Sequence, residues 1–332
     1  MKPLPVKPGL WLFLILLVFL LLAPCGSSPA GEDTSPPEAL FRVSRIRPDV
    51  RFRLSDFGEV LEFETDSALI RTTQRRAELL AEAGAEITRV FAPTSLSAPP
   101  VPSRVISKSG AEEPVIREIL NLVDRDGLEE IMGDLTGENL VTIGGVERRI
   151  LTRNSYQTEG IAWATGYAYE RLEGLGLEVA YHEYEYNGNS WRNVVAEQPG
   201  SVNPEQIYII CAHIDNLPTG PVAPGADDNA SGSTAVLAAA GILSDYSFEY
   251  TVRYLLFTGE EQGLIGSYYY VQDVLAAGDF IAGALNFDMI AYDGDSDGAM
   301  EIYSGTTGAS NLLGDLFLDT IEVYGLALDP VY

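Results

Sequence analysis

Four short polar clusters lie where predicted strands end in the second half of the chain. They read AHID at 212–215, PGADDNASG at 224–232, TGEEQG at 258–263 and LNFDMI at 285–290. Carboxylates at the ends of buried strands are costly unless a positive group lies nearby or a proton is bound. The clusters together hold one histidine, many carboxylates and too few cations. A bound divalent metal would resolve that imbalance, and one imidazole among carboxylates suits zinc or another first-row ion.

Each cluster also has a plainer interpretation when it is taken singly. A histidine after a strand, such as His213, is more often a structural hydrogen-bonding residue than a ligand. Adjacent aspartates before a helix, such as Asp227 and Asp228, commonly serve as an N-cap with a neighbour favoured by the helix dipole. As a ligand, His213 would be held through its other ring nitrogen by Asp215. Only the joint pattern therefore points to a metal.

Composition limits the kinds of site and partner. The 332 residues hold 48 acidic and 21 basic side chains, two His and two Cys, for a net charge of −27. So negative a surface argues against nucleic acid and anionic membranes as partners. Cys25 falls in the predicted leader, which leaves Cys211 alone and excludes a disulfide framework or a Cys-rich zinc site. His182 lies upstream within a predicted strand, where we expect a structural role.

The order and spacing of the four clusters resemble the co-catalytic zinc aminopeptidases of peptidase family M28, which include secreted bacterial enzymes of the leucyl aminopeptidase kind. The resemblance covers roughly residue 111 to the end of the chain and implies two zinc ions. It implies metal ligation by His213, Asp227, Glu261 and Asp288, with Asp227 bridging the two ions and Glu260 acting as general base. It also implies a cis peptide between Asp227 and Asp228, and supporting roles for Asp215 and Asp228.

One part of the family pattern is missing. The family places a further histidine on the second metal within a later Ser-Asp-His motif, and no histidine follows His213 in this sequence. We therefore expect the sequence to be truncated at its C-terminus. If residue 332 is the true end, we expect weak binding of the second metal and poor or no activity.

Strand and helix patterns alternate along residues 111–332. The alternation predicts an α/β domain in which a mixed, largely parallel sheet is covered by helices on both faces, with sites at the carboxyl ends of strands. Helical spacing marks 115–123 and 128–135. Predicted strands lie at 177–185, 193–197, 206–212, 251–258, 281–290 and 300–303, and further helices at 158–172, 230–243, 264–276 and 310–324.

The first 110 residues divide into four parts. Residues 1–30 are predicted to be a signal peptide, because lysines precede an apolar run at 10–23 that is short for a membrane span. Lipid attachment at Cys25 is the weaker alternative, since Pro24 stands where a lipoprotein box wants a small residue. Residues 31–40 are predicted to be a disordered spacer and 93–110 a Pro-rich linker. Between them, 41–92 form a small α+β unit with strands at 51–54, 59–63 and 86–91 and a helix at 67–83. This unit is either a propeptide or an accessory packing domain.

We therefore expect an exported zinc-dependent aminopeptidase, in the periplasm or outside the cell, acting on peptides or proteins. The alternatives are a carboxypeptidase or a glutaminyl cyclase-like enzyme of the same fold, or a non-catalytic binding domain of the cell envelope. The missing histidine supports the last of these. No stable partner is inferred.

Overall fold

The computed structural model describes residues 38–44, 53–63, 67–82, 85–90, 112–217, 221–293, 298–304 and 308–331. The predicted signal peptide and the linker at 93–110 lie outside these residues. Within the described ranges, no helix combines the length and the apolar character that crossing a membrane requires.

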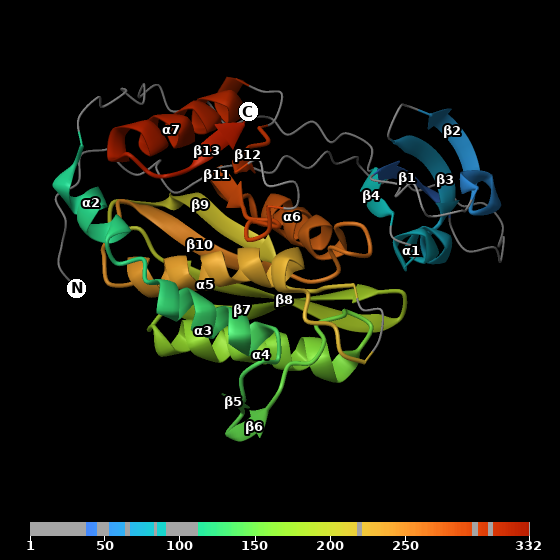
Figure 1. The fold of residues 1–332 in the computed structure, drawn as a ribbon, viewed down its shortest axis with the longest axis horizontal. Coiled ribbons are helices and arrows are strands. Elements are labelled where there is room, and N and C mark those ends of the chain that lie inside the picture. The colour runs from blue at the N-terminus through green and yellow to red at the C-terminus, as the bar shows by residue number, and fades with distance from the viewer. Residues whose placement is uncertain are drawn as a thin grey trace.

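The centre of the molecule is a five-stranded mixed sheet in the order β11-β9-β10-β8-β7 (Figure 1). Strands β11, β9 and β10 are parallel, whereas β8 runs antiparallel to β10 and β7 antiparallel to β8. The mixed α/β architecture predicted from the alternating pattern is confirmed. The strands span Glu178–Tyr186 (β7), Asn189–Gln198 (β8), Asn203–His213 (β9), Tyr250–Phe257 (β10) and Phe280–Asn286 (β11).

Both faces of the sheet are buried, as the nearly continuous apolar sequence of β9 requires. Ile210 and Ala212 of β9 belong to the core formed with α3, α4 and α5, whereas Ile209 and Cys211 point the other way and pack with α6. The helices span Pro114–Leu120 (α2), Arg125–Leu135 (α3), Thr158–Gly174 (α4), Gly232–Leu243 (α5), Ile265–Ala277 (α6) and Gly308–Tyr324 (α7).

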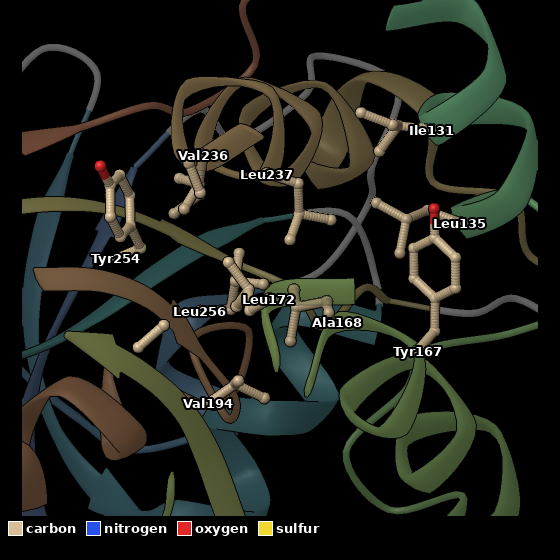
Figure 2. Close-up of a cluster of buried hydrophobic side chains, with 14 of the residues drawn as sticks. Ile131, Leu135, Tyr167, Ala168, Leu172, Val194, Val236, Leu237, Tyr254 and Leu256 are labelled. Carbon is tan, nitrogen blue, oxygen red and sulfur yellow. The ribbon is translucent and has the colours of Figure 1, made fainter. Parts of the chain in front are cut away.

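The larger core lies between the sheet and helices α3, α4 and α5. Figure 2 shows Leu172 of α4 and Leu237 of α5 between Tyr254 and Leu256 of β10 on one side and Leu135 of α3 on the other. These five side chains are almost completely buried. Each buried side chain of this size contributes about 1.5–3 kcal/mol through the hydrophobic effect. This packing fixes the strands whose ends carry the polar clusters.

The domain also contains two small two-stranded sheets, most of which the sequence did not predict. Strands β5 and β6 form a hairpin, and β12 pairs with β13 in parallel. Of these strands, only β12 overlaps a predicted one. They span Val141–Ile143 (β5), Val146–Arg148 (β6), Ala299–Glu301 (β12) and Asp329–Val331 (β13).

The described residues of the N-terminal unit form a four-stranded antiparallel sheet, one α-helix and a short 3-10 helix. Three predictions for it were wrong. Strand β1 begins at Glu38, inside the predicted spacer; a short 3-10 helix at Leu54–Asp56 (η2) replaces the end of a predicted strand; and the first half of the predicted helix is strand β3. The β3 sequence ALIRTT is rich in β-branched residues and alternates in burial, which favours a strand. The elements are β1 (Glu38–Ser44), β2 (Glu59–Phe63), β3 (Ala68–Thr73), α1 (Gln74–Glu82) and β4 (Glu86–Val90).

This N-terminal unit packs against the loops at the carboxyl ends of β9 and β10. Leu217, which follows β9, packs against the unit's own hydrophobic core. The side-chain amide of Gln74 in α1 donates to the backbone oxygen of Gln262 at 2.5 Å. The hydroxyl of Tyr156 donates to Glu78 of α1 at 2.5 Å. The N-terminal unit therefore packs beside the TGEEQG cluster.

Candidate metal centre

The parallel strands bring three of the polar clusters to one edge of the sheet. His213 at the end of β9 pairs in register with Phe257 of β10, three residues before Glu260. Asn286 of β11 pairs with Cys211, so that Asp288 leaves the sheet at nearly the same level. This is the position at which sites form in sheets with parallel strands. Asp288 follows β11, which ends at Asn286 and not at 290 as predicted.

His213 lies at the centre of the cluster and only 3 % of it is exposed. Its Nε2 atom lies 3.2 Å from Oδ1 of Asp228 and 3.3 Å from Oδ1 of Asp288. On the other side of the ring, Nδ1 lies 3.2 Å from the backbone oxygen of Asp215 and 3.6 Å from its carboxylate. His213 and Asp288 therefore meet as predicted. Asp215 sits behind the ring, but its carbonyl oxygen is nearer than its carboxylate.

Asp227 was predicted to be the metal ligand and Asp228 the supporting residue, but the structure reverses these positions. Asp228 faces His213, whereas Oδ1 of Asp227 accepts a hydrogen bond from the backbone N–H of Ala291 at 2.9 Å. The cis peptide joins Asp228 to Asn229, so its predicted position was wrong by one residue. The sequence pattern does not distinguish Asp227 from Asp228. Their environment does, because Asp227 also accepts from the hydroxyl of Ser231.

The loop that carries Asp228 is held by glycines and by α5. Gly225 has φ +50°, in the left-handed region that favours glycine. At Gly232, a Cβ atom would lie 2.3 Å from the backbone oxygen of Phe287, so the start of α5 touches the end of β11 directly. Asn229 strengthens this contact, because its amide donates to the same oxygen at 3.0 Å. The segments bearing Asp228 and Asp288 are thus joined by backbone contact.

The adjacent glutamates point to different partners. Oε2 of Glu260 lies 4.0 Å from Nε2 of His213, and the Glu260 side chain is 28 % exposed. The backbone N–H of Glu260 donates to Asp215 at 3.3 Å. Glu261 turns toward the loop after β9, where its Oε1 accepts from the backbone N–H of Leu217 at 2.9 Å. Glu260 therefore faces the histidine cluster, while Glu261 occupies its margin.

The protonation equilibria of this cluster are strongly shifted. Burial and the neighbouring aspartates raise the pKa of Glu260 to about 8, although the charge of His213 opposes the shift. Burial, followed by the charges of Asp228 and Glu260, raises the pKa of Glu261 well above its ordinary value. Burial alone would lower the pKa of His213, but the surrounding carboxylates raise it well above the ordinary value. The cluster holds more negative charge than its own residues can neutralise.

The donor set fits a divalent metal. One ligand atom each from His213, Asp228 and Asp288 lie within 4.8 Å of one another. One imidazole nitrogen and two carboxylate oxygens match the ligands of catalytic zinc sites, which keep a further position open. In the described part of the chain, this is the one group of three such side chains that lie so close together. The predicted second metal position has Glu261 nearby but no complete ligand group among these residues.

The sequence interpretation missed the segment 152–155, which underlies the cluster. The Ser155 hydroxyl donates to Asp215 at 3.0 Å and accepts from the N–H of Gly259 at 2.9 Å. Arg153 donates to the backbone oxygen of Ile214, next to His213. The one sequence signal was the polar run TRNS directly before the predicted helix at 158–172, which resembles any helix-capping loop.

Comparison with known proteins places this site in a familiar context. Residues 193–327 match the model of peptidase family M28. Leucine aminopeptidase 2 of Trichophyton rubrum is 32 % identical over 186 residues, covering 55 % of this chain and 34 % of that protein. A probable zinc metalloprotease of Pyrenophora teres f. teres is 30 % identical over 207 residues, covering 56 % of this chain and 43 % of that one. The chain thus spans less than half of the length of these relatives.

Solved structures agree on the fold. The LapA aminopeptidase of Legionella pneumophila superposes with a TM-score of 0.62 at 17 % identity, covering 90 % of this chain and 81 % of that one. LapB from Legionella pneumophila gives a TM-score of 0.53 at 18 % identity, covering 79 % and 73 %. The residues of the metal centre all fall inside the matched segment. The part of the chain that carries the site, residues 193–327, is therefore similar to peptidase family M28.

Proposed function

We propose that the protein is an exported zinc-dependent aminopeptidase. The observation that carries the proposal is the convergence of His213, Asp228 and Asp288 on one point, with Glu260 beside it. A zinc ion at that point would be held by these three side chains. The family resemblance implies a second ion, which Glu261 and Asp228 would hold.

Zinc would act as a Lewis acid on the scissile carbonyl and would make a water molecule more acidic at neutral pH. The chain's own contribution is a proton shuttle. Glu260 lies at the edge of the cluster, and its carboxylate accepts the proton of the attacking water and returns it to the leaving amine. The raised pKa of Glu260 supports this role, because its surroundings favour the protonated form near neutral pH. Asp215 and Ser155 hold the loop on which Glu260 sits.

An assay with leucyl-4-nitroanilide tests this function. Metal-free protein is incubated with and without excess zinc or cobalt, and bound metal is counted alongside turnover. We expect at least one ion per chain and hydrolysis that depends on it. The rate is expected to be low, since the described residues offer only two side chains for the second ion. The N-acetylated substrate should not react, because an aminopeptidase requires a free N-terminus.

Two variants sharpen the assay. Glu260→Gln should reduce kcat by about 10²-fold or more while leaving zinc stoichiometry unchanged, because it removes general-base catalysis. Glu178→Gln, at an exposed position of β7, is the matched control and should behave as the unchanged protein. Hydrolysis that survives Glu260→Gln would refute the proposed mechanism. Preferential attack on the blocked substrate would show that a free N-terminus is not required and would refute the aminopeptidase assignment.

We also propose that the N-terminal unit is a propeptide, with 93–110 as the segment that is cut. Support comes from its seat beside the site: α1 bonds to Gln262, next to Glu261, and Leu217 packs against the unit's core. Cleavage in 93–110 should therefore increase kcat/KM for peptides, and adding the separated unit back should reverse the gain. Equal kcat/KM before and after cleavage would instead make it an accessory packing domain.

Export rests on the predicted signal peptide. Expression of the full sequence in a bacterial host should place the chain outside the cytoplasm, beginning after Ala30, as read by mass spectrometry. A lipid-modified chain beginning at Cys25 would show the lipoprotein alternative to be correct.

A further inference from the structure

Arg153 is a fully buried arginine whose side chain is bonded to backbone oxygens. It is 0 % exposed, and it is among the largest side chains that are buried so completely. Its Nε donates to Ile214 at 2.8 Å, Nη2 to Gly225 at 2.8 Å, and Nη1 to Leu135 at 2.7 Å and Pro224 at 2.6 Å. The planar guanidinium presents its donors in a fixed fork, so these four carbonyls are held in one arrangement.

The four carbonyls come from three segments that are remote in sequence. Ile214 stands between His213 and Asp215, at the end of β9. Pro224 and Gly225 begin the loop that carries Asp228. Leu135 is the last residue of α3, which is anchored in the large core. One side chain thus sets the spacing between the segment that carries the histidine and the segment that carries the aspartate, and it ties both to a rigid helix.

The backbone around Arg153 repeats the same connections. The Arg153 N–H donates to the side chain of Asn216 at 2.9 Å, and the Asn216 amide donates to the backbone oxygen of Ala223 at 2.7 Å. The next residues bind the backbone oxygen of Asn216 through Asn154 and the carboxylate of Asp215 through Ser155. The metal-bearing loops are therefore clamped at several points by one short segment.

The positive charge of Arg153 lies near the carboxylates of the metal centre. Burial lowers the pKa of the Arg153 guanidinium to about 10, and the charges of Asp215, Asp228 and Glu261 oppose that shift, so it stays charged at neutral pH. Because the guanidinium donates to neutral carbonyls and not to a carboxylate, its positive charge is not neutralised by a local ion pair. A buried cation behind a group of carboxylates stabilises their ionised, metal-binding form.

We propose that Arg153 is a positioning residue of the metal centre, which fixes the separation of the His213 and Asp228 segments through its four carbonyl bonds. The inference rests on the proposed metal site. Residues that orient metal ligands without touching the metal typically account for 10–100-fold in affinity. A role limited to stabilising the fold would leave zinc affinity unchanged in folded protein.

The test measures zinc affinity of metal-free 332-residue protein by competition with a fluorescent chelator. Arg153→Lys keeps the charge but cannot span four carbonyls, and we expect zinc to bind at least tenfold more weakly. Arg153→Met, which also removes the charge, should bind more weakly still. Arg192→Met is the matched control: Arg192 donates to the Ala162 carbonyl and to Thr165, away from the metal loops. Its zinc affinity should stay within twofold.

Circular dichroism establishes that each variant is folded, and the visible spectrum of bound cobalt gives an independent view of ligand geometry. We expect an altered cobalt spectrum in Arg153→Lys and an unaltered one in Arg192→Met. Zinc affinity within twofold of the unchanged protein in folded Arg153→Lys overturns the inference. Failure of Arg153→Lys to fold overturns it too, since the guanidinium would then be needed for the fold itself. If the unchanged protein binds no zinc, the proposed metal centre fails instead.

Discussion

The metal-free protein should lose stability as the pH rises from about 5 to 8, and Glu260 should be a main cause. The pKa of Glu260 is raised from 4.5 to about 8 by burial and by the nearby aspartates. Between these values the folded chain binds a proton that the unfolded chain has released. Because stability falls with pH wherever the folded state binds more protons, this contribution is complete below pH 4.5 and is lost as pH passes through 8.

The size of the effect follows from the two pKa values. Each tenfold difference in proton affinity corresponds to about 1.4 kcal/mol, so protonated Glu260 stabilises the folded state by about 5 kcal/mol relative to its ionised form. His213 acts with the same sign: its raised pKa gives stability that is present below its ordinary value of 6.5 and is lost at higher pH. Zinc should reverse the trend by replacing the protons, so its affinity should rise with pH.

Thermal unfolding in the presence of a chelator measures this directly at pH 5, 6, 7 and 8. Glu260→Gln is the decisive variant, because a neutral amide needs no proton. At pH 8 it should melt about 10 °C higher than the unchanged metal-free protein, and the two should converge toward pH 5. The acidic residues outside the cluster repel one another more as pH rises, but they do so equally in both proteins. Parallel melting curves across the pH range would refute the reasoning.

Three further results are expected. Asp228→Asn should weaken zinc binding at least tenfold, while Asp227→Asn should change it far less, as measured by chelator competition. If Asp227→Asn has the larger effect, the sequence-based assignment of Asp227 as the ligand is correct. Gly232→Ala should cost at least about 2 kcal/mol in denaturant unfolding because of its close backbone contact, whereas Gly241→Ala on the same helix, with open space around it, should stabilise by about 0.5–1 kcal/mol. Burial raises the pKa of the Cys211 thiol to about 12, so in a Cys25→Ser background it should react with a disulfide reagent only after unfolding, and prompt native-state labelling would contradict its burial.

The sheet and most of its helices could be predicted because their periodicity is strong. β9 and β10 are apolar on both faces and are bounded by polar clusters, so the run itself marks the strand. α4 and α5 show helical spacing of apolar residues in the sequence, and both are helices in the folded chain. The N-terminal unit was harder, since the stretch that becomes β3 and α1 has no breaker between strand and helix. The sequence ALIRTTQRRAELLAE can be read as one helix, and only pairing with β1 makes its first part a strand.

The site could be predicted as a group of residues but not as a geometry. That His213, Glu260 and Asp288 would meet follows from the rule that parallel strands end at one edge. Which of Asp227 and Asp228 faces the histidine depends on a loop whose course is set by Gly225 and by hydrogen bonds to Ser231 and Ala291. The contact between Asp227 and Ala291 joins residues 64 positions apart, and no local pattern encodes it.

Arg153 could not be predicted from the charges that lie near the carboxylates in the sequence. In the sequence, Arg253 is the cation nearest to the carboxylates, but in the structure it lies in the middle of β10 and pairs with Glu197 and Asp279. The cation that faces the metal loops comes instead from a segment about sixty residues earlier than His213. A carboxylate-rich site needs positive charge to remain ionised, and a metal ion supplies it only when bound. A permanent buried guanidinium keeps the carboxylates partly ionised in the interval without metal, so the centre is prepared to bind before any ion arrives.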